Sequence, residues 1–368
     1  MRLFVIPVKM GTHKRCIFTS MKQVDYIIVG LGLAGLAFSR ELEKQGKTFI
    51  VYEDNSQHSS LVAGGMYNPI ILKRFTPVWD VENQLKVALP FYKELEDLLG
   101  SRYDYKVSIY RLFTSIEEQN NWFATCDHPF LSEYMIPKVI KENYKGIESP
   151  FGYGKVIGTG RIDTKKLLND YRNYLQENDN ILNERFDYEA IEFKGENVLY
   201  KRCSASKIVF CEGYGIKQNP YFNDLPMQEA KGELITIYAP ELDIDFVLKS
   251  SVSIMPLGEH KFKVGATFNW KDKTNIPTEE GKNELLSKLE SLISVPFKVI
   301  EHVAGIRPTV KDRRPLVGIH HERPELATLN GLGTRGVMIA PAAAKELYDC
   351  LENGIELRKE INISRFLS

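Results

Sequence analysis

The stretch over residues 25–54 constrains the fold more than any other part of the chain, because it has the pattern of one supersecondary unit. Residues 26–29 are a short apolar run that is typical of a buried parallel strand. A helix is predicted over 33–45, and a second apolar strand over 48–52. Strand, helix and strand together predict a βαβ unit near the start of the chain.

A glycine-rich turn joins the first strand to the helix and predicts that this unit binds a dinucleotide. Its spacing is G-x-G-x-x-G, which allows a tight turn, a close approach of the backbone to a pyrophosphate, and close packing of helix on strand. The helix N-terminus offers free N–H groups and a partial positive charge to phosphates. An acid at the end of the second strand can accept hydrogen bonds from a ribose. A glycine-rich turn without a ligand is the alternative. The predicted cofactor contacts here are Gly30, Gly32, Leu33, Ala34, Gly35 and Glu53.

The composition is that of an ordinary globular protein without net charge. The 368 residues include 48 Lys plus Arg and 48 Asp plus Glu, which argues against a general nucleic-acid-binding surface and leaves only a local basic patch open. No apolar run approaches the roughly 18 residues that a transmembrane helix needs. The cysteines form no CxxC pair and no metal-binding spacing with histidines, so we predict reduced thiols, no metal site and a cytoplasmic location. They are Cys16, Cys126, Cys203, Cys211 and Cys350.

Residues 1–20 are expected to be a disordered or non-native extension, with the fold starting near Met21. The extension is basic and has no acid, but its apolar part is too short for a signal peptide and is interrupted by Pro7.

Three later segments are expected to contribute to the same binding site. The loop over 55–69 contains the small residues Ala63, Gly64 and Gly65, which suit a backbone that lies against a flat ring system; a flexible surface loop is the alternative. A buried strand over 207–210 leads to Gly213. A second glycine-rich turn over 331–336 opens a helix over 337–351. Between them, 232–268 has the alternating pattern of antiparallel strands.

Several motifs in a fixed order resemble the D-amino acid oxidase family of FAD-dependent oxidoreductases, and most of all its glycine oxidase members. The resemblance covers roughly 25–351 and is weak over about 80–150. The last glycine-rich turn is also similar to the FAD domain of the bifunctional tRNA wobble-uridine modification enzyme. Besides the βαβ unit, the motifs are Ala63-Gly64-Gly65, Gly305-Ile306-Arg307-Pro308, Asp312 with Pro315-Leu316-Val317-Gly318, and Gly331-Leu332-Gly333-Thr334-Arg335-Gly336 with Ala340-Pro341.

The resemblance implies a mixed α/β fold in which a Rossmann-like FAD-binding domain is interleaved with an antiparallel-sheet substrate domain. The FAD-binding domain would combine 21–90, 151–230 and 305–360. The substrate-binding domain would combine 91–150 and 231–304.

The resemblance also implies that the cofactor is FAD, bound without a covalent link. Where some relatives attach the flavin through a cysteine, this chain has Ile306 or its neighbours. The helix that begins after the second glycine-rich turn would place N–H groups near the flavin pyrimidine edge and stabilise negative charge there. A purely structural turn is the alternative. The further cofactor contacts are Ala63, Gly64, Gly65, Gly213, Gly331, Gly333, Thr334, Arg335, Gly336 and Val337.

The family reaction is the oxidation of an amine next to a carboxylate, with hydride transfer from the α-carbon to flavin N5. Arg307 matches the arginine that holds the substrate carboxylate, and Arg335 matches a second arginine beside the flavin. Lys263 falls where related sarcosine oxidases have the lysine that helps O₂ react with the reduced flavin. A strand-end ion pair, a surface arginine and a solvated lysine are the respective alternatives. Ser253 replaces a substrate-contacting tyrosine of glycine oxidase, so the exact substrate does not transfer.

Four functions stay open at this point. The first is an FAD-dependent oxidoreductase that acts on a CH–NH or CH–NH₂ group of a small amine or amino acid, with O₂ or another electron acceptor. The second is an FAD enzyme acting on a modified tRNA wobble uridine, and the third a catalytically inactive flavoprotein that serves assembly. A nicotinamide-dependent dehydrogenase would leave the second glycine-rich turn unexplained. The substrate, the acceptor and the oligomeric state are not decided by the sequence.

Overall fold

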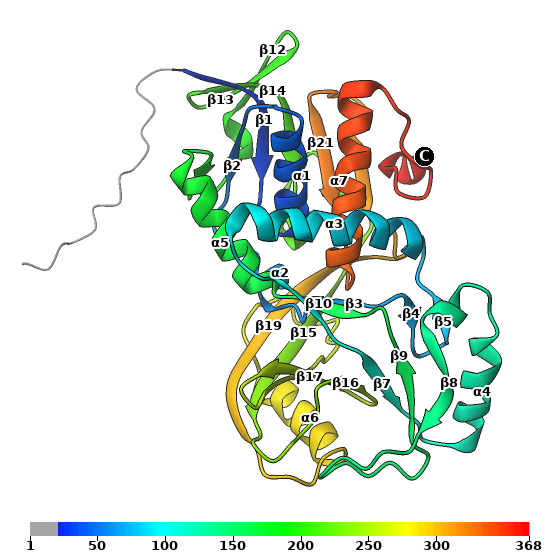
Figure 1. Cartoon of the computed structure of the whole chain (residues 1–368). Helices are drawn as coiled ribbons and strands as arrows, with labels where there is room; N and C mark the ends of the chain where they lie inside the picture. Colours follow the sequence, from blue (N-terminus) through cyan, green and yellow to red (C-terminus); the bar gives the residue numbers. More distant parts are fainter. Residues whose placement is uncertain (1–20, 368) are drawn as a thin grey trace, which may run out of the picture.

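The computed structural model describes residues 21–367, so the predicted extension over 1–20 and the Cys16 thiol lie outside the described residues. Two lobes are stacked along the long direction of the molecule, each built on an eight-stranded sheet (Figure 1). The long strands β15 (Met227–Tyr238) and β19 (Lys298–Val310) pair with each other over nearly their whole lengths in the second lobe.

The first sheet is built around the predicted βαβ unit. Its central strands run parallel in the order β11-β2-β1-β14-β21. Strand β20 and the hairpin of β12 and β13 add antiparallel edges. The carboxyl ends of the parallel strands therefore meet at one edge of the sheet, where ligands bind in such folds. The strands are β1 (Lys22–Val29), β2 (Phe49–Tyr52), β11 (Ile181–Leu182), β12 (Ile191–Lys194), β13 (Asn197–Tyr200), β14 (Cys203–Phe210), β20 (Leu316–Ile319) and β21 (Leu326–Asn330).

Four helices pack in one apolar cluster with one face of this sheet: α1 (Leu33–Lys44), α3 (Val81–Leu99), α5 (Thr164–Glu177) and α7 (Gly336–Asn353). The predicted first helix is confirmed. A proline inside a helix is expected to kink or split it, but α3 runs unbroken through Pro90. The reason is that Pro90 lies on the exposed face of α3, while the helix buries an apolar stripe that includes Leu85, Phe91 and Leu95.

The second sheet has the order β19-β15-β18-β17-β16-β7-β9-β8. It is antiparallel as predicted, except that β16 and β7 run parallel. The apolar run over 246–255 forms two strands rather than one, because the chain turns between 249 and 253. Helix α6 (Glu279–Glu290) shares one apolar core with this sheet. The remaining strands are β7 (Ile109–Leu112), β8 (Met135–Ile140), β9 (Tyr153–Val156), β16 (Val247–Lys249), β17 (Ser253–Gly258) and β18 (Lys261–Gly265).

Short elements complete the chain between the two sheets and around them. The segment predicted as a loop over 55–69 contains one helical turn, α2, which lies against β19. The short elements are α2 (Ser59–Val62), α4 (Ile116–Cys126), β3 (Met66–Tyr67), β4 (Ile70–Ile71), β5 (Thr76–Pro77), β6 (Asp104–Lys106), β10 (Gly160–Ile162) and the 3-10 turns η1 (Leu131–Glu133), η2 (Tyr188–Ala190), η3 (Gly213–Gln218) and η4 (Ile363–Phe366).

The predicted fold class is confirmed: a largely parallel sheet with helices is interleaved with an antiparallel sheet. The domain boundaries stay a prediction. Among residues 21–367, no helix has both the length and the apolar character needed to cross a membrane.

Candidate active site

A cavity of about 610 Å³ lies where the carboxyl edge of the first sheet meets the second sheet. This volume is within the range of about 300–1,000 Å³ that is usual for small-molecule sites. One end is lined by residues that follow β1, β2, β11 and β14, and the other end by residues of β15, β16, β17, β18 and β19. The N-termini of α1 and α7 lie along the cavity between these ends.

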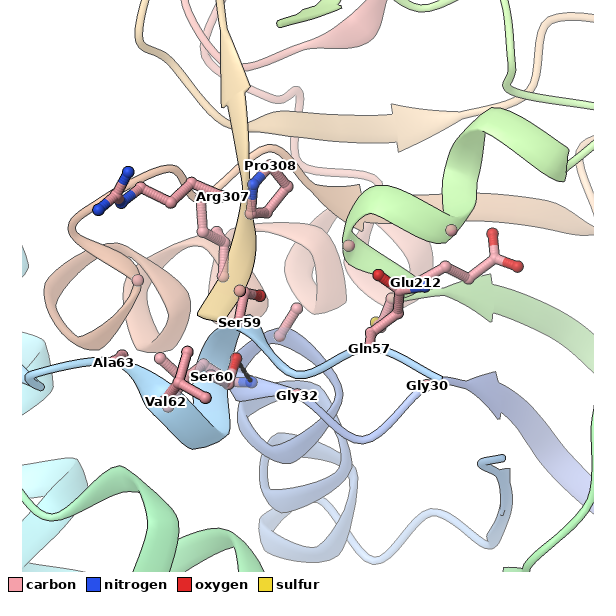
Figure 2. Close-up of a pocket in the computed structure, with 18 of the residues that line it drawn as sticks. Gly30, Gly32, Gln57, Ser59, Ser60, Val62, Ala63, Glu212, Arg307 and Pro308 are labelled. Atoms are coloured by element: carbon pink, nitrogen blue, oxygen red, sulfur yellow. Dashed lines mark hydrogen bonds between the residues drawn. The ribbon is translucent and has the colours of Figure 1, made fainter. Parts of the chain in front are cut away.

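The first glycine-rich turn lines the cavity. Figure 2 shows Gly30 and Gly32 between β1 and α1, with Ser60 beside them. The N-cap residue of α1 is Gly32, which has no side chain to cap the helix, and the first turn of α1 has no acidic residue. The Leu33 N–H donates to Ser60 Oγ at 3.2 Å. Gly35 does not line the cavity. A Cβ there would stand 2.0 Å from the Gly30 carbonyl oxygen, so Gly35 allows the helix to pack closely on the strand.

Glu53 lies at the end of β2 and contacts the same turn. Its carboxylate accepts hydrogen bonds from the Leu31 N–H and, at 2.6 Å, from the Asn55 N–H. The side chain is 9% exposed and lines the cavity. A buried carboxylate that is fixed in this way has lone pairs available for the hydroxyl groups of a ribose.

Glu212, which the sequence analysis did not single out, lies at the same end of the cavity. Its carboxylate accepts hydrogen bonds from Tyr188 Oη and, at 2.7 Å, from Asn219 Nδ2. Burial raises the pKa of Glu212 to about 7, against the opposing effect of these two hydrogen bonds. The residue directly follows Cys211 at the carboxyl end of β14, and this position was the sequence signal that could have revealed it.

The second glycine-rich turn reaches the cavity through part of its length. Gly333, Thr334, Gly336 and Val337 line the cavity, and helix α7 begins here without a side-chain cap or an acid in its first turn. Arg335 is the N-cap residue but is not among the lining residues, and neither is Gly331. Burial lowers the pKa of Arg335, and the charge of Arg313 lowers it further.

Arg307 on β19 extends its guanidinium group across the neighbouring strand. A Cβ on Gly232 of β15 would stand 2.0 Å from Arg307 Nη2, so only glycine leaves room for this position. Nη1 and Nη2 each donate to the Thr267 carbonyl at 3.2 Å, and the group stacks on the Phe268 ring at 4.3 Å from its centroid. In the described part of the chain no carboxylate lies within 4.0 Å of Arg307, and burial lowers its pKa to about 10.

Two lysines of the second sheet line the same end of the cavity as Arg307. Lys263 on β18 was predicted, and Lys249 on β16 was not. Neither forms an ion pair with a carboxylate of residues 21–367. Burial lowers the pKa of Lys263, while Glu301 and Asp163 oppose this shift from beyond ion-pair distance.

Most of the predicted site residues are thus brought together from distant parts of the sequence. Their roles stay predictions. Three of the predicted residues do not line the cavity: Gly35, Gly331 and Arg335. The predicted residues that do line it are Gly30, Gly32, Leu33, Ala34, Glu53, Ala63, Gly64, Gly65, Gly213, Lys263, Arg307, Gly333, Thr334, Gly336 and Val337.

These features fit an extended dinucleotide with a ring system at one end. The N-terminus of α1, which has no acid in its first turn, suits a pyrophosphate, and the fixed Glu53 carboxylate suits a ribose. The N-terminus of α7, which has no side-chain cap, lies toward the second sheet. Fold and cavity therefore define a dinucleotide-binding protein.

The chain belongs to the DAO family, described as FAD dependent oxidoreductase, whose family model matches residues 25–350. Glycine oxidase of Bacillus subtilis (strain 168) is 22% identical over 363 residues, which cover 93% of this chain and 95% of that protein. The predicted family, fold class and FAD cofactor are confirmed.

Two further comparisons extend this result. The tRNA 5-methylaminomethyl-2-thiouridine biosynthesis bifunctional protein MnmC of Campylobacter jejuni subsp. doylei is 22% identical over 306 residues and 82% of this chain, but the chain spans only 47% of that protein's length. The crystal structure of glycine oxidase from Bacillus cereus ATCC 14579 has a TM-score of 0.72 at 18% identity, and covers 90% of this chain and 96% of its own. This likeness concerns the fold alone.

Proposed function

We propose that the protein oxidises a small amine or amino acid at a carbon next to a carboxylate, with Arg307 binding that carboxylate. The observation that supports the proposal is the fixed guanidinium group of Arg307, which faces the cavity without a carboxylate partner among residues 21–367. Its two terminal nitrogens share one carbonyl acceptor, so donors remain for a bidentate contact with a ligand.

Each part of the cavity has a distinct task in this proposal. The N–H groups at the start of α1 bind the pyrophosphate of FAD, and Glu53 binds its ribose. The start of α7 stabilises negative charge near the ring. Arg307 orients the substrate so that its α-hydrogen faces the ring, and Lys263 provides a cation there. FAD bound in this cavity would supply the acceptor for a hydride from the substrate α-carbon.

FAD binding without a covalent link is part of the proposal. Cys211 is the one cysteine among the described cavity-lining residues, and burial raises the pKa of its thiol far above the usual range. A buried neutral thiol is a poor nucleophile, so it is not expected to attach the flavin. Denaturing the protein with acid should release the entire flavin into the supernatant.

The proposal is tested by anaerobic addition of small amino acids and N-methyl amino acids to the purified flavoprotein. Bleaching of the flavin band near roughly 450 nm by one compound is expected, and exposure to air then separates oxidase from dehydrogenase. In Arg307→Lys the substrate concentration that gives the half-maximal rate of bleaching should rise at least about 100-fold, because a point charge replaces the bidentate fork. Arg102→Lys, which changes an exposed arginine outside the cavity lining, is the matched control.

Two results would contradict the proposal. If no amine bleaches the flavin, a catalytically inactive flavoprotein or a larger substrate is favoured. If Arg307→Lys and Arg102→Lys behave alike, Arg307 does not bind the substrate.

A modified tRNA base is the second candidate substrate, because MnmC proteins are among the relatives. The turn after β19 exposes Lys311 and Arg313, and the half-buried Arg314 stacks on Trp79 at 4.5 Å from the ring centroid. The zero net charge of the chain counts against it. Bleaching of the flavin by hypomodified tRNA, lost when Lys311 and Arg313 are changed to Gln, would favour this candidate.

A further inference from the structure

The charged residues that line the cavity are distributed unequally between its two ends. At the end formed by the second sheet, the lining includes three cations and no acid: Lys249, Lys263 and Arg307. The lining acids follow strands of the first sheet, at the other end, and are Glu53, Asp54, Glu184 and Glu212. The substrate end therefore attracts anions, and it has more positive charge than one carboxylate can neutralise.

Lys249 is the cation at this end that no expected function explains. Its Nζ donates to Ser253 Oγ on the next strand, and in the described part of the chain it has no carboxylate partner. Directly opposite on β7 lies Arg111, whose own charge is neutralised by Glu118 at 2.7 Å. Glu118 is thus already paired. Keeping a half-buried ammonium group without an acid is costly unless a ligand supplies the negative charge.

Lys249 belongs to a row of residues that are paired across four strands, and every residue of this row lines the cavity. Leu234, Gly265, Ser253 and Lys249 stand directly opposite one another on β15, β18, β17 and β16. Gly265 has no side chain and Ser253 has a short one, so no bulky side chain projects from the sheet between Lys249 and β15. This leaves room for a ligand that lies across the strands.

The two cationic groups are too far apart to bind one carboxylate. The Arg307 guanidinium lies over Gly232 of β15, and Lys249 Nζ lies at Ser253 of β17. Strand β18 separates these two strands, and Gly232 lies two residues along β15 from Leu234, which is in register with Ser253, so the groups are on the order of 12 Å apart. Two hydrogen bonds of about 2.8 Å each leave roughly 6 Å between the two ligand oxygens that accept them. That gap fits two carboxylates joined by two or three carbon atoms.

We propose that the substrate has a second anionic group and that Lys249 binds it, so the substrate class is an amine or amino acid with two carboxylates. The inference rests on the proposed function, because Arg307 is taken to bind the first carboxylate. Lys249 is a specificity-determining residue in this arrangement. Lys263, on the strand between the two binding groups, remains free for the reacting centre.

The test compares succinate with butyrate, which have the same number of carbon atoms and differ in one carboxylate. Neither has an amine, so both are redox-inert probes of binding. Each is titrated into the FAD-loaded protein, and the dissociation constant is read from the change in the flavin spectrum. Succinate is expected to bind about 10–100-fold more tightly than butyrate, the usual effect of a charged hydrogen bond.

Variants assign the preference to one side chain. Lys249→Gln should remove the preference for succinate and leave butyrate binding unchanged, while Lys249→Arg should retain part of it. Lys145→Gln, which removes an exposed lysine paired with Glu241, is the matched control and should change neither constant. Spectra of FAD release would show that all variants hold the cofactor equally.

Four results would overturn the inference. Equal binding of both probes by the unmodified protein excludes a second anion site. An equal loss of both probes in Lys249→Gln would mean that Lys249 supports the same carboxylate as Arg307. If neither probe perturbs the flavin, the proposed function fails together with the inference. If butyrate binding depends on Arg307 but the ratio of succinate to butyrate affinity is unchanged in Lys249→Gln, only the inference fails.

Discussion

Adding one methyl group at Gly232 should disable carboxylate binding without removing any charged group. A Cβ at this position would stand 2.0 Å from Arg307 Nη2, 2.2 Å from Cζ and 2.5 Å from Nη1. Ordinary contacts begin at 3.4 Å, so in Gly232→Ala the guanidinium must move by about 1.4 Å. A misplacement of about 1 Å can reduce the productive interaction by about 100-fold. We therefore expect the dissociation constant of a redox-inert carboxylate to rise about 100-fold.

The fold should tolerate this substitution. The atoms that collide with the new methyl group are the far end of a flexible side chain, and Gly232 does not have a positive φ. Alanine also lowers the entropy of the unfolded chain, worth about 0.4–1 kcal/mol in the stabilising direction. The urea unfolding midpoint and the amount of bound FAD are expected to stay close to those of the unmodified protein.

The assay is a double-mutant cycle with Arg307→Ala, read as the dissociation constant of butyrate from the flavin spectrum. If Gly232→Ala acts only through the guanidinium, it should have no further effect once that group is absent. An unchanged dissociation constant in the single variant Gly232→Ala would refute the reasoning. So would a second 100-fold loss in the double variant, because the methyl group would then act by another route.

Three other changes have defined outcomes. Lys231→Met removes an ion-pair partner of Asp272 and of the buried Glu233. In urea titrations it should lower the free energy of unfolding by about 3–5 kcal/mol, whereas breaking an exposed ion pair costs at most about 1 kcal/mol. Lys263→Met should slow flavin reoxidation by O₂ much more than reduction by substrate, and equal slowing would contradict that role. Burial lowers the pKa of Lys249 to about 8, so succinate affinity should be full well below pH 8 and fall as the pH rises through 8, whereas butyrate affinity should persist.

The direction of this last effect follows from the groups that surround Lys249. The protonated ammonium binds the anion, so affinity is lost as Lys249 gives up its proton. Arg111 on β7 disfavours the proton and Glu118 neutralises Arg111, while Ser253 on β17 does not titrate in this range. Because Arg307 stays protonated to about pH 10, the first carboxylate is still bound when the second contact has gone. A parallel loss of both affinities would assign the titration to another group.

The parts of the fold that follow from local sequence were predictable. The βαβ unit combines short apolar strands, glycines at fixed spacing and an acid at a strand end, and each of these signals acts within about 30 residues. Pro90 shows where such local rules fail: its position on the exposed face of α3 was invisible until the burial of the helix was known. The parallel pairing of β16 with β7 also joins segments far apart in the sequence.

The candidate site was predictable only where a motif marks it. Arg307 stands in the motif Gly305-Ile306-Arg307-Pro308, but nothing near it in the sequence indicates Gly232, more than 70 residues away, whose missing side chain gives the guanidinium its place. Lys249 was missed for the same reason. Alone it is one more lysine at the end of a short apolar run, one of 48 basic residues in the chain.

What distinguishes Lys249 from an ordinary surface lysine is a set of relations between strands. It lies opposite Ser253 and Arg111, faces a cavity that Arg307 also reaches, and has no acid within ion-pair distance in residues 21–367. A solvated lysine needs no counter-ion, because water stabilises its charge, whereas a buried one needs a partner or a ligand. The pairing of the strands therefore reveals the proposed role of Lys249, which no sequence motif marks. The ratio of succinate to butyrate affinity measures how much Lys249 contributes to binding a second carboxylate.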